Sequence, residues 1–313
     1  MISMRYHIVS LAAVFLALAL GIVLGATKIS SPLLAGLQGD ANSLTAERDA
    51  LKKENATLSA GAASSEDIAA AVGDVAVRGI FRPSPTVVLI TTADANSADR
   101  DAVLALLGKA GAVLASQVQL TADFTDPSRA QEVRSLVTSN IPAGQKLPEV
   151  QDVGTLMGSL LSLILVADES GSSKATEAEA TQAMSALTTA GFIRSSGALK
   201  AGRLVVVLTG GAATGGSEGD RAAAVASLAA QLKTTANGVV LAGRQGSATA
   251  PTGAVGVIRA DTADSASVTT VDDVDLASGR LATVLGLAEQ DLGKAGRYGS
   301  DVTAQARIPS LAT

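Results

Sequence analysis

Residues 86–92 read Thr-Val-Val-Leu-Ile-Thr-Thr, a continuous apolar and β-branched run preceded by prolines at positions 83 and 85. Such a run is typical of a strand that is buried on both faces of a sheet. A second run of the same kind, Arg-Leu-Val-Val-Val-Leu-Thr, occupies residues 203–209. Because doubly buried strands occur in parallel sheets covered by helices, the two runs predict an α/β layered fold with a largely parallel sheet.

A helix and a further strand follow each of these two strands. The first unit continues with a helix at 97–108 and a strand at 111–120. The second continues with a glycine-rich loop, a helix at 217–234 and a strand at 238–241. Asp99-Arg100 and Asp220-Arg221 take matching places near the starts of the two helices. The pattern therefore predicts two related halves or one sheet built twice.

Other elements complete an α/β domain that we assign to residues 66–299. The remaining helices are predicted at 131–139, 153–165, 176–190 and 276–290, and the remaining strands at 255–259 and 268–271. The apolar segment 157–166 is too short to span a bilayer core of about 30 Å, which favours a core helix. A short helix is expected from residue 65 to about 77, after a hinge at 61–65, and residues 300–313 are expected to form a flexible tail.

The N-terminal region carries an uncharged run at residues 8–26, Ile-Val-Ser-Leu-Ala-Ala-Val-Phe-Leu-Ala-Leu-Ala-Leu-Gly-Ile-Val-Leu-Gly-Ala. As a helix, it nearly crosses a hydrocarbon core of about 30 Å, and we assign a transmembrane helix to residues 8–29. The alternative is a cleaved signal peptide, but the run exceeds the usual apolar length of about 7–15 residues. Arg5, His7 and the N-terminal amine outweigh Lys28, which predicts a cytoplasmic segment at 1–7 and an extracytoplasmic C-terminal domain.

A leucine heptad follows this anchor, and we assign a coiled coil to residues 33–60. Leucine recurs every seventh residue at the d positions, and Asn55 lies at an a position, a combination that favours a parallel dimer in one register. Gly21 and Gly25 form a G-x-x-x-G pair that would let two anchor helices approach closely. A coiled coil with a different chain and packing of the helix on its own domain remain as alternatives. The predicted dimerisation residues are Gly21, Gly25, Leu34, Leu37, Leu44, Leu51, Asn55 and Leu58.

The composition excludes several classes of function. The chain of 313 residues has 24 Lys and Arg against 29 Asp and Glu, a net charge of −5. Nucleic-acid binding needs clustered basic residues, so no nucleic-acid partner is expected. Cysteine is absent, which excludes a disulfide framework, a zinc ribbon and thiol chemistry.

One motif has the form of a catalytic signature. Residues 215–219 match G-x-S-x-G, but Ser217 lies well beyond the end of the preceding strand, and the single histidine is His7. A serine hydrolase needs a strand-to-helix elbow and a histidine base, so a flexible loop with a helix N-cap is the better explanation. Glu218 and Asp220 would repel a phosphate at the same helix terminus. We therefore expect no enzymatic activity and no cofactor.

Metal donors are sparse in this sequence. Soft metals prefer clustered thiolate, thioether or imidazole ligands, and Met157 and Met184 are expected in the core. A turn with Asp272, Asp273 and Asp275 offers carboxylates for a hard cation, although such a turn more often caps the helix that follows. Metal-binding residues therefore stay unassigned. The four methionines are Met1, Met4, Met157 and Met184.

Both ends of the chain resemble one protein family. The first segment is residues 1–21, Met-Ile-Ser-Met-Arg-Tyr-His-Ile-Val-Ser-Leu-Ala-Ala-Val-Phe-Leu-Ala-Leu-Ala-Leu-Gly. The second comprises Val-Asp-Asp-Val-Asp at 271–275, Gly-Arg at 279–280, and 293–299 with Tyr298. These segments resemble the actinobacterial copper transporter family typified by mycobacterial MctB, over nearly the full chain. The family has no agreed set of functional residues to carry over.

The resemblance implies a role in copper homeostasis, as efflux or passage of copper ions across the outer envelope, which is one expected location. Members are also described as SteB-like, in a cell-separation complex with a membrane partner, SteA, that acts on a peptidoglycan hydrolase. The alternative is therefore a non-enzymatic dimeric scaffold that recruits or regulates cell-wall enzymes. In both cases we expect a single-pass membrane protein and a parallel homodimer.

Overall fold

The computed structural model describes residues 4–168, 171–197 and 199–310, apart from the side chains of residues 26–35. The chain divides into two compact units, Met1–Ser64 and Ser65–Thr313. The first is helical in all its described residues. The second is an α/β domain.

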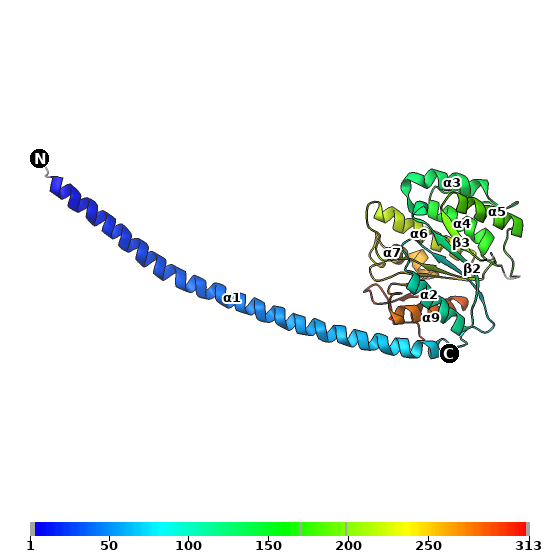
Figure 1. Ribbon diagram of the computed structural model, residues 1–313, viewed down its shortest axis with the longest axis horizontal. Coiled ribbons are helices and arrows are strands. Elements are labelled where there is room, and N and C mark those ends of the chain that lie inside the picture. Colours follow the sequence, from blue (N-terminus) through cyan, green and yellow to red (C-terminus); the bar gives the residue numbers. More distant parts are fainter. Residues whose placement is uncertain (1–3, 169–170, 198, 311–313) are drawn as a thin grey trace. The chain divides into compact units, whose positions relative to one another are not determined.

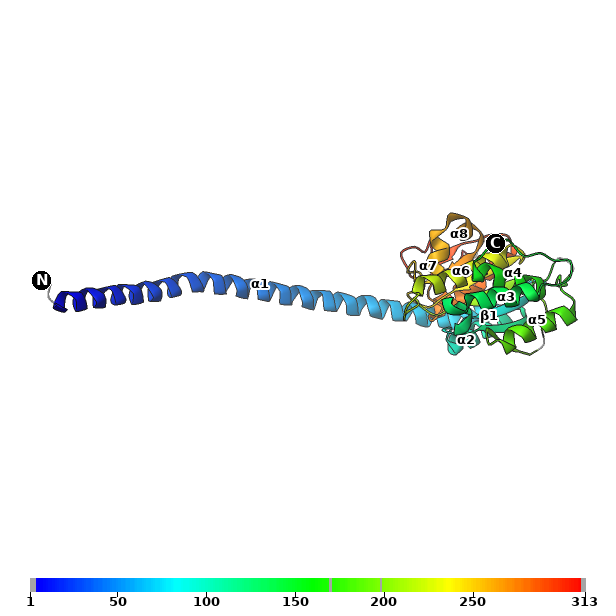
Figure 2. The ribbon, with the colours of Figure 1, turned by 90° about the horizontal axis from the view of Figure 1, so that it is seen from above.

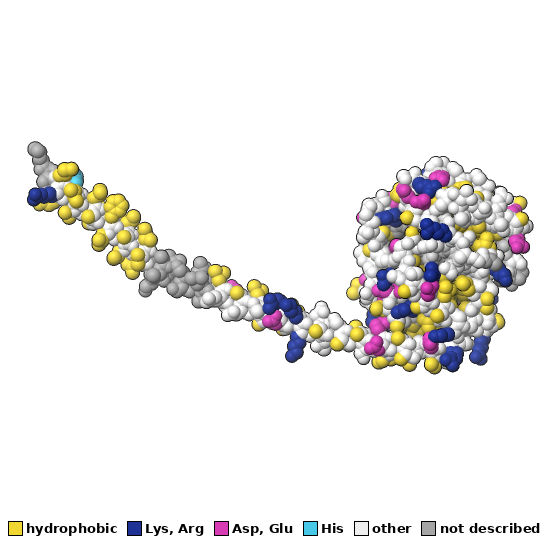
Figure 3. All heavy atoms as spheres, viewed as in Figure 1, with side chains coloured by type: hydrophobic (Ala, Val, Ile, Leu, Met, Phe, Trp, Pro, Cys, Tyr) yellow, Lys and Arg dark blue, Asp and Glu magenta, His cyan; other side chains and the backbone are white. Residues whose placement is uncertain are grey.

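Helix α1 spans Met4–Ala76. Its segment Met4–Gly25, 22 residues, is apolar and long enough to cross a membrane, as a single-pass anchor requires. Figure 3 shows apolar side chains covering this segment. The predicted hinge at 61–65 is wrong, because these residues continue the helix. A single glycine costs a helix only about 1 kcal/mol, and alanine and serine neighbours do not add enough to break it.

Seven strands form one sheet in the described part of the chain, in the order β3-β2-β1-β4-β5-β6-β7. All neighbouring strands are parallel except β3, which pairs antiparallel with β2 at one edge. The mostly parallel α/β prediction is confirmed. A relation between two halves stays a prediction. The strands are β1 (Thr86–Thr91), β2 (Val113–Leu120), β3 (Ile193–Ser196), β4 (Leu204–Leu208), β5 (Gly238–Ala242), β6 (Thr269–Val271) and β7 (Arg297–Tyr298).

Helices cover both faces of this sheet, as Figure 1 shows. One apolar core lies under α3 to α7, and a second lies under α2 and α9, so the domain has three layers. The helices of the domain are α2 (Ser97–Ala110), α3 (Ala130–Ser139), α4 (Val153–Leu165), α5 (Glu177–Thr189), α6 (Glu218–Lys233), α7 (Ala254–Ala260), α8 (Thr262–Ser267) and α9 (Ala277–Asp291). Short 3₁₀ helices occur at Ala122–Thr125 and Pro127–Arg129.

Helices α4 and α6 lie against each other over the sheet (Figure 2). Gly154 and Gly158 allow this close approach, since a Cβ atom at either position would come within 3.0 Å of α6 backbone atoms. The 13 residues of α4 are almost entirely buried, which confirms the core helix predicted at 153–165.

One local prediction is wrong, and one strand was not predicted. The strand predicted at 255–259 is wrong, because Ala254–Ala260 form α7. Gly256 allows α7 to pack against the Ala248 carbonyl, so tertiary packing prevails over the β propensity of its valines. Strand β3 was missed, because Ile193–Ser196 is short, mostly exposed and polar. Ser300 and Asp301, just beyond the domain boundary predicted at residue 299, donate to Asp272, and the boundary itself stays a prediction.

Candidate functional site

The predicted dimerisation leucines lie on one exposed stripe of α1. We call Leu37, Leu44, Leu51 and Leu58 the leucine stripe. Their exposed fractions are 59%, 64%, 58% and 67%. Such large apolar side chains in one row indicate a surface that binds another apolar surface. The side chain of Leu34 lies outside the described residues.

Polar residues interrupt the stripe at the a positions. Asn55 lies between Leu51 and Leu58 and accepts a hydrogen bond of 3.3 Å from the Ser59 hydroxyl. Arg48 forms an exposed ion pair with Asp49 at 2.8 Å. A shallow groove runs along this part of the helix, and it is lined by Leu44, Glu47, Arg48, Leu51, Lys52 and Asn55.

The glycine pair of the anchor leaves the helix surface open. At Gly21 and Gly25 an added Cβ atom would meet nothing within 4 Å. The surrounding side chains are apolar and exposed, for example Leu20 at 59% and Ile22 at 63%. This geometry permits the close helix contact that the G-x-x-x-G spacing predicts.

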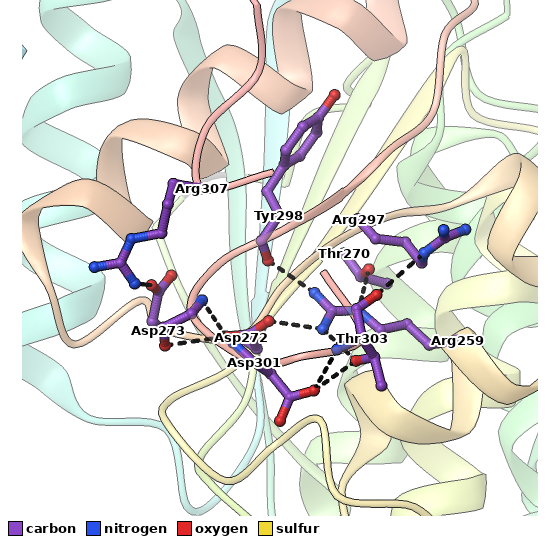
Figure 4. Close-up of polar contacts among 10 residues, drawn as sticks. Arg259, Thr270, Asp272, Asp273, Arg297, Tyr298, Asp301, Thr303 and Arg307 are labelled. Atoms are coloured by element: carbon purple, nitrogen blue, oxygen red, sulfur yellow. Dashed lines mark hydrogen bonds and ion pairs between the residues drawn. The ribbon is translucent and has the colours of Figure 1, made fainter. Parts of the chain in front are cut away.

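Arginines from other elements lie against the acidic turn after β6 (Figure 4). Arg259 of α7 donates to Asp272 at 2.7 Å, and their side chains are 3% and 2% exposed. The Arg259 guanidinium also donates to the Tyr298 carbonyl oxygen at 2.7 Å and the Thr270 hydroxyl at 3.0 Å. The other Asp272 oxygen accepts from the backbone amide of Ser300 at 2.8 Å. Asp272 therefore ties the C-terminal segment to the sheet.

Asp273 has a different environment. Its side chain is fully buried, neither carboxylate oxygen has a hydrogen-bond partner, and the nearest Arg307 nitrogen is 3.6 Å away. Burial, and then the adjacent Asp272 charge, raise the pKa of Asp273 to about 6, while Arg307 opposes the shift. Figure 4 shows Arg307 pointing to this carboxylate from the C-terminal segment.

Asp275, the third carboxylate of this turn, and the N-terminus of α9 bond to other parts of the chain, and no side chain of the turn caps α9. Asp275 accepts from the backbone amide of Gln245 at 3.1 Å. Within the described residues, no group of three or more His, Cys, Asp or Glu side chains is arranged to hold a metal ion. The N-terminus of α9 is capped instead by Glu66 of α1, which accepts from the Ser278 amide at 3.0 Å and its hydroxyl at 2.5 Å. The predicted local cap is therefore replaced by one 212 residues distant in sequence.

Soft copper donors are dispersed in this chain. Met157 and Met184 are 0% and 2% exposed, within the apolar core under α3 to α7, as predicted. Met4 is 80% exposed at the start of α1, where His7 follows one turn later. Met1 lies outside the described residues. The α/β domain thus has no thiolate, imidazole or exposed thioether among its described residues.

A cavity of about 230 Å³ opens at the carboxyl ends of β1, β2 and β4. The chain runs from β1 to β2 on one side and returns to β4 on the other, so the strand order reverses here. Open α/β sheets bind ligands at such a switch point. Asp94 and Arg221 line the cavity together with the threonines that follow the strands. Its polar lining residues are Thr92, Asp94, Thr121, Thr125, Thr209, Thr214, Arg221 and Thr252.

The glycine-rich loop beside this cavity is not a nucleophile elbow. Ser217, the residue before α6, has a φ of 52°, and its hydroxyl makes no capping bond, contrary to the predicted N-cap. Glu218 instead accepts from the Gly216 amide at 2.9 Å. That bond holds the pKa of Glu218 below its usual value, so a carboxylate already faces the helix N-terminus.

Sequence reasoning missed this cavity because no motif marks it. Thr92, Thr121 and Thr209 directly follow three strands, and that shared place was the available signal. The arginine that completes the lining, Arg221, was noticed only as half of a repeated Asp-Arg pair.

Comparison with known proteins gives one consistent result. Residues 1–309 match the model of a family described as "Copper transport outer membrane protein, MctB". The copper transporter MctB of Mycobacterium tuberculosis is 37% identical over 308 residues, 96% of each chain. The corresponding proteins of Mycobacterium bovis and Mycobacterium leprae are 37% and 34% identical, again over 96% of each chain.

Proposed function

This chain belongs to the MctB family, and on that premise we propose that it is a non-enzymatic, membrane-anchored envelope protein of copper homeostasis or efflux that works as a parallel homodimer. Family membership over nearly the whole chain supports the copper role. The exposed leucine stripe supports the dimer, because four leucines more than half exposed need an apolar partner surface.

The anchor sets the proposed topology. Arg5 and the N-terminal amine precede the apolar segment, and Lys28 follows it. The side with more positive charge is the cytoplasmic one, so the α/β domain is extracytoplasmic. The family description names an outer membrane, whereas a helix with a cytoplasmic N-terminus spans the inner one, so we propose a single-pass envelope protein and assign neither membrane.

We assign the copper role to the assembled anchor and its partners, and not to a copper-binding site within the α/β domain. Met157 and Met184 are buried in an apolar core, where no second donor type accompanies them. Copper ions are therefore the cargo of the proposed assembly, with no binding residues assigned.

A complementation experiment tests both parts of this proposal. A deletion strain receives the wild type, Leu44→Asp plus Leu51→Asp, or a matched control, Ala46→Asp plus Lys53→Asp, at the outward f positions of the heptad. Growth on copper and cellular copper content are measured. We expect sensitivity and copper accumulation in the deletion strain, rescue by the wild type and the control, and no rescue by the leucine variant.

Normal copper tolerance with normal copper content in the deletion strain would rule out the copper role. Rescue by the leucine variant, with equal protein levels, would instead leave the copper role intact and rule out the stripe as its working surface.

A second candidate function is a scaffold that recruits or regulates peptidoglycan hydrolases in cell separation, with a SteA-like membrane partner. The leucine stripe favours it as well, because a dimeric coil can present a partner surface without any catalytic group. Affinity capture from membranes tests this candidate. It predicts that a membrane partner or hydrolase copurifies with the wild type and the f-position control but not with the leucine variant. Equal capture by all three would contradict it.

A further inference from the structure

The switch-point cavity has the charges of a small zwitterion site, and we propose that it binds a free amino acid or dipeptide. This inference goes beyond the proposed copper function. The amine of the ligand is placed at Asp94 and its carboxylate at Arg221, with the threonine hydroxyls between them. No residue of this cavity belongs to the leucine stripe or to the buried Asp272 network.

Asp94 is held in place at the end of β1. The Thr92 hydroxyl donates to one of its carboxylate oxygens. Gly210, in the loop after β4, packs directly against the other, where a Cβ atom would come within 3.0 Å. Side chains larger than glycine would therefore displace the carboxylate. The close fit fixes a negative charge at the edge of the cavity.

Arg221 supplies the opposite charge from the first turns of α6. Its guanidinium donates to the Thr214 carbonyl oxygen, which orients it. Its Nε–H is buried and has no hydrogen-bond partner. Buried donors without an acceptor are rare in folded proteins, so this one indicates a place where a ligand oxygen belongs.

Thr209 adds a hydroxyl to the lining. It follows β4 directly, and its side chain is 5% exposed. A polar ligand in the cavity would accept from the buried Arg221 Nε–H and lie beside this hydroxyl.

Size and charge narrow the class of ligand. A cavity of about 230 Å³ is smaller than the roughly 300–1,000 Å³ of sites for drug-sized ligands. Glu218 and Asp220 occupy the first turn of α6 and disfavour a phosphate there. A neutral sugar would leave both Asp94 and Arg221 without charged partners. Ala122, Ala222 and Val225 supply an apolar wall for a small side chain.

Calorimetry on the detergent-solubilised full-length chain tests the proposal. The probes are L-alanyl-L-alanine, its N-acetylated amide, which lacks both charges, glucose and inorganic phosphate. We expect saturable binding of the free dipeptide and binding weaker by about tenfold or more for the capped one. Equal binding of both dipeptides, binding of glucose or phosphate in place of the dipeptide, or no saturable dipeptide binding would overturn it.

Three variants assign the site. Asp94→Asn keeps the acceptor for Thr92 and removes the charge, and Arg221→Met removes the guanidinium. The control, Arg194→Met, makes the same change at an exposed residue on β3, outside the cavity. The first two should each weaken dipeptide binding about tenfold or more, and the control should not. Unchanged binding in both cavity variants would place the ligand elsewhere.

Discussion

At the scale of single residues, Asp273 is a buried carboxylate in an unfavourable electrostatic environment. It is fully buried beside Asp272, without a hydrogen bond, and Arg307 at 3.6 Å only partly compensates. A carboxylate in that position costs free energy whenever it is charged. The C-terminal segment that carries Arg307 is consequently coupled to the charge of this one side chain.

The pH dependence of stability follows from that coupling. The folded pKa of about 6 exceeds the usual 3.8, so the folded state holds the proton more tightly. The stabilisation of the folded state that protonated Asp273 contributes is fully present below about pH 4 and is lost as the pH rises through about 6. We predict that the free energy of unfolding of the wild type falls by about 1–2 kcal/mol between pH 4.5 and pH 7.5. Asp273→Asn should remove this fall, and urea unfolding at the two pH values measures it.

The matched control is Asp101→Asn, whose carboxylate is 64% exposed. This substitution should leave the difference in the free energy of unfolding between pH 4.5 and pH 7.5 as it is in the wild type. A fall of the same size in wild type and Asp273→Asn would show that another group causes it.

At the scale of elements, the contact between α4 and α6 depends on two missing side chains. A Cβ at Gly154 would come within 3.0 Å of the Ala224 carbonyl oxygen. We predict that Gly154→Ala lowers the free energy of unfolding by about 1–3 kcal/mol, because the helices must separate. Thermal unfolding followed by circular dichroism measures this.

Gly108 in α2 is the control for this substitution. It is also helical, but an added Cβ would meet nothing within 4 Å there. Gly108→Ala should therefore be neutral or stabilising by up to about 1 kcal/mol, since alanine favours the helix. A loss of equal size at both glycines would refute the packing explanation for Gly154.

The elements that were predicted correctly are those with strong periodic or apolar patterns. The buried runs at 86–92 and 203–209 became β1 and β4, and 153–165 became α4. The misassigned segment 255–259 has strand-forming residues, but close packing through Gly256 makes it a helix. Strand β3 could not be predicted because its polar residues form an edge strand only by pairing with β2. A local sequence pattern does not show which distant segments will pair.

The candidate site was less predictable than the fold, for the same reason. The leucine stripe lies within one short stretch of sequence, so its heptad spacing could be recognised from the sequence alone. Arg259 and Arg307 reach the acidic turn, and Glu66 reaches the helix after it, only through the folded chain. The switch-point cavity likewise exists only once the order of the strands is known.

At the scale of the whole molecule, we propose that two chains pair through α1. In this proposal the anchor holds the protein at a membrane, and the leucine stripe and Asn55 select a parallel partner in one register. The α/β domain is then the proposed recognition head of the assembly. The copper role and the scaffold role both require this pairing.

Disulfide cross-linking in isolated membranes measures that pairing most directly. The chain has no cysteine, so Leu44→Cys introduces the only thiol. In a parallel dimer each d residue faces its own counterpart, while f residues point apart. We predict a covalent dimer on oxidation of Leu44→Cys and little for the outward Ala46→Cys. Equally weak cross-linking of both variants would contradict the parallel dimer.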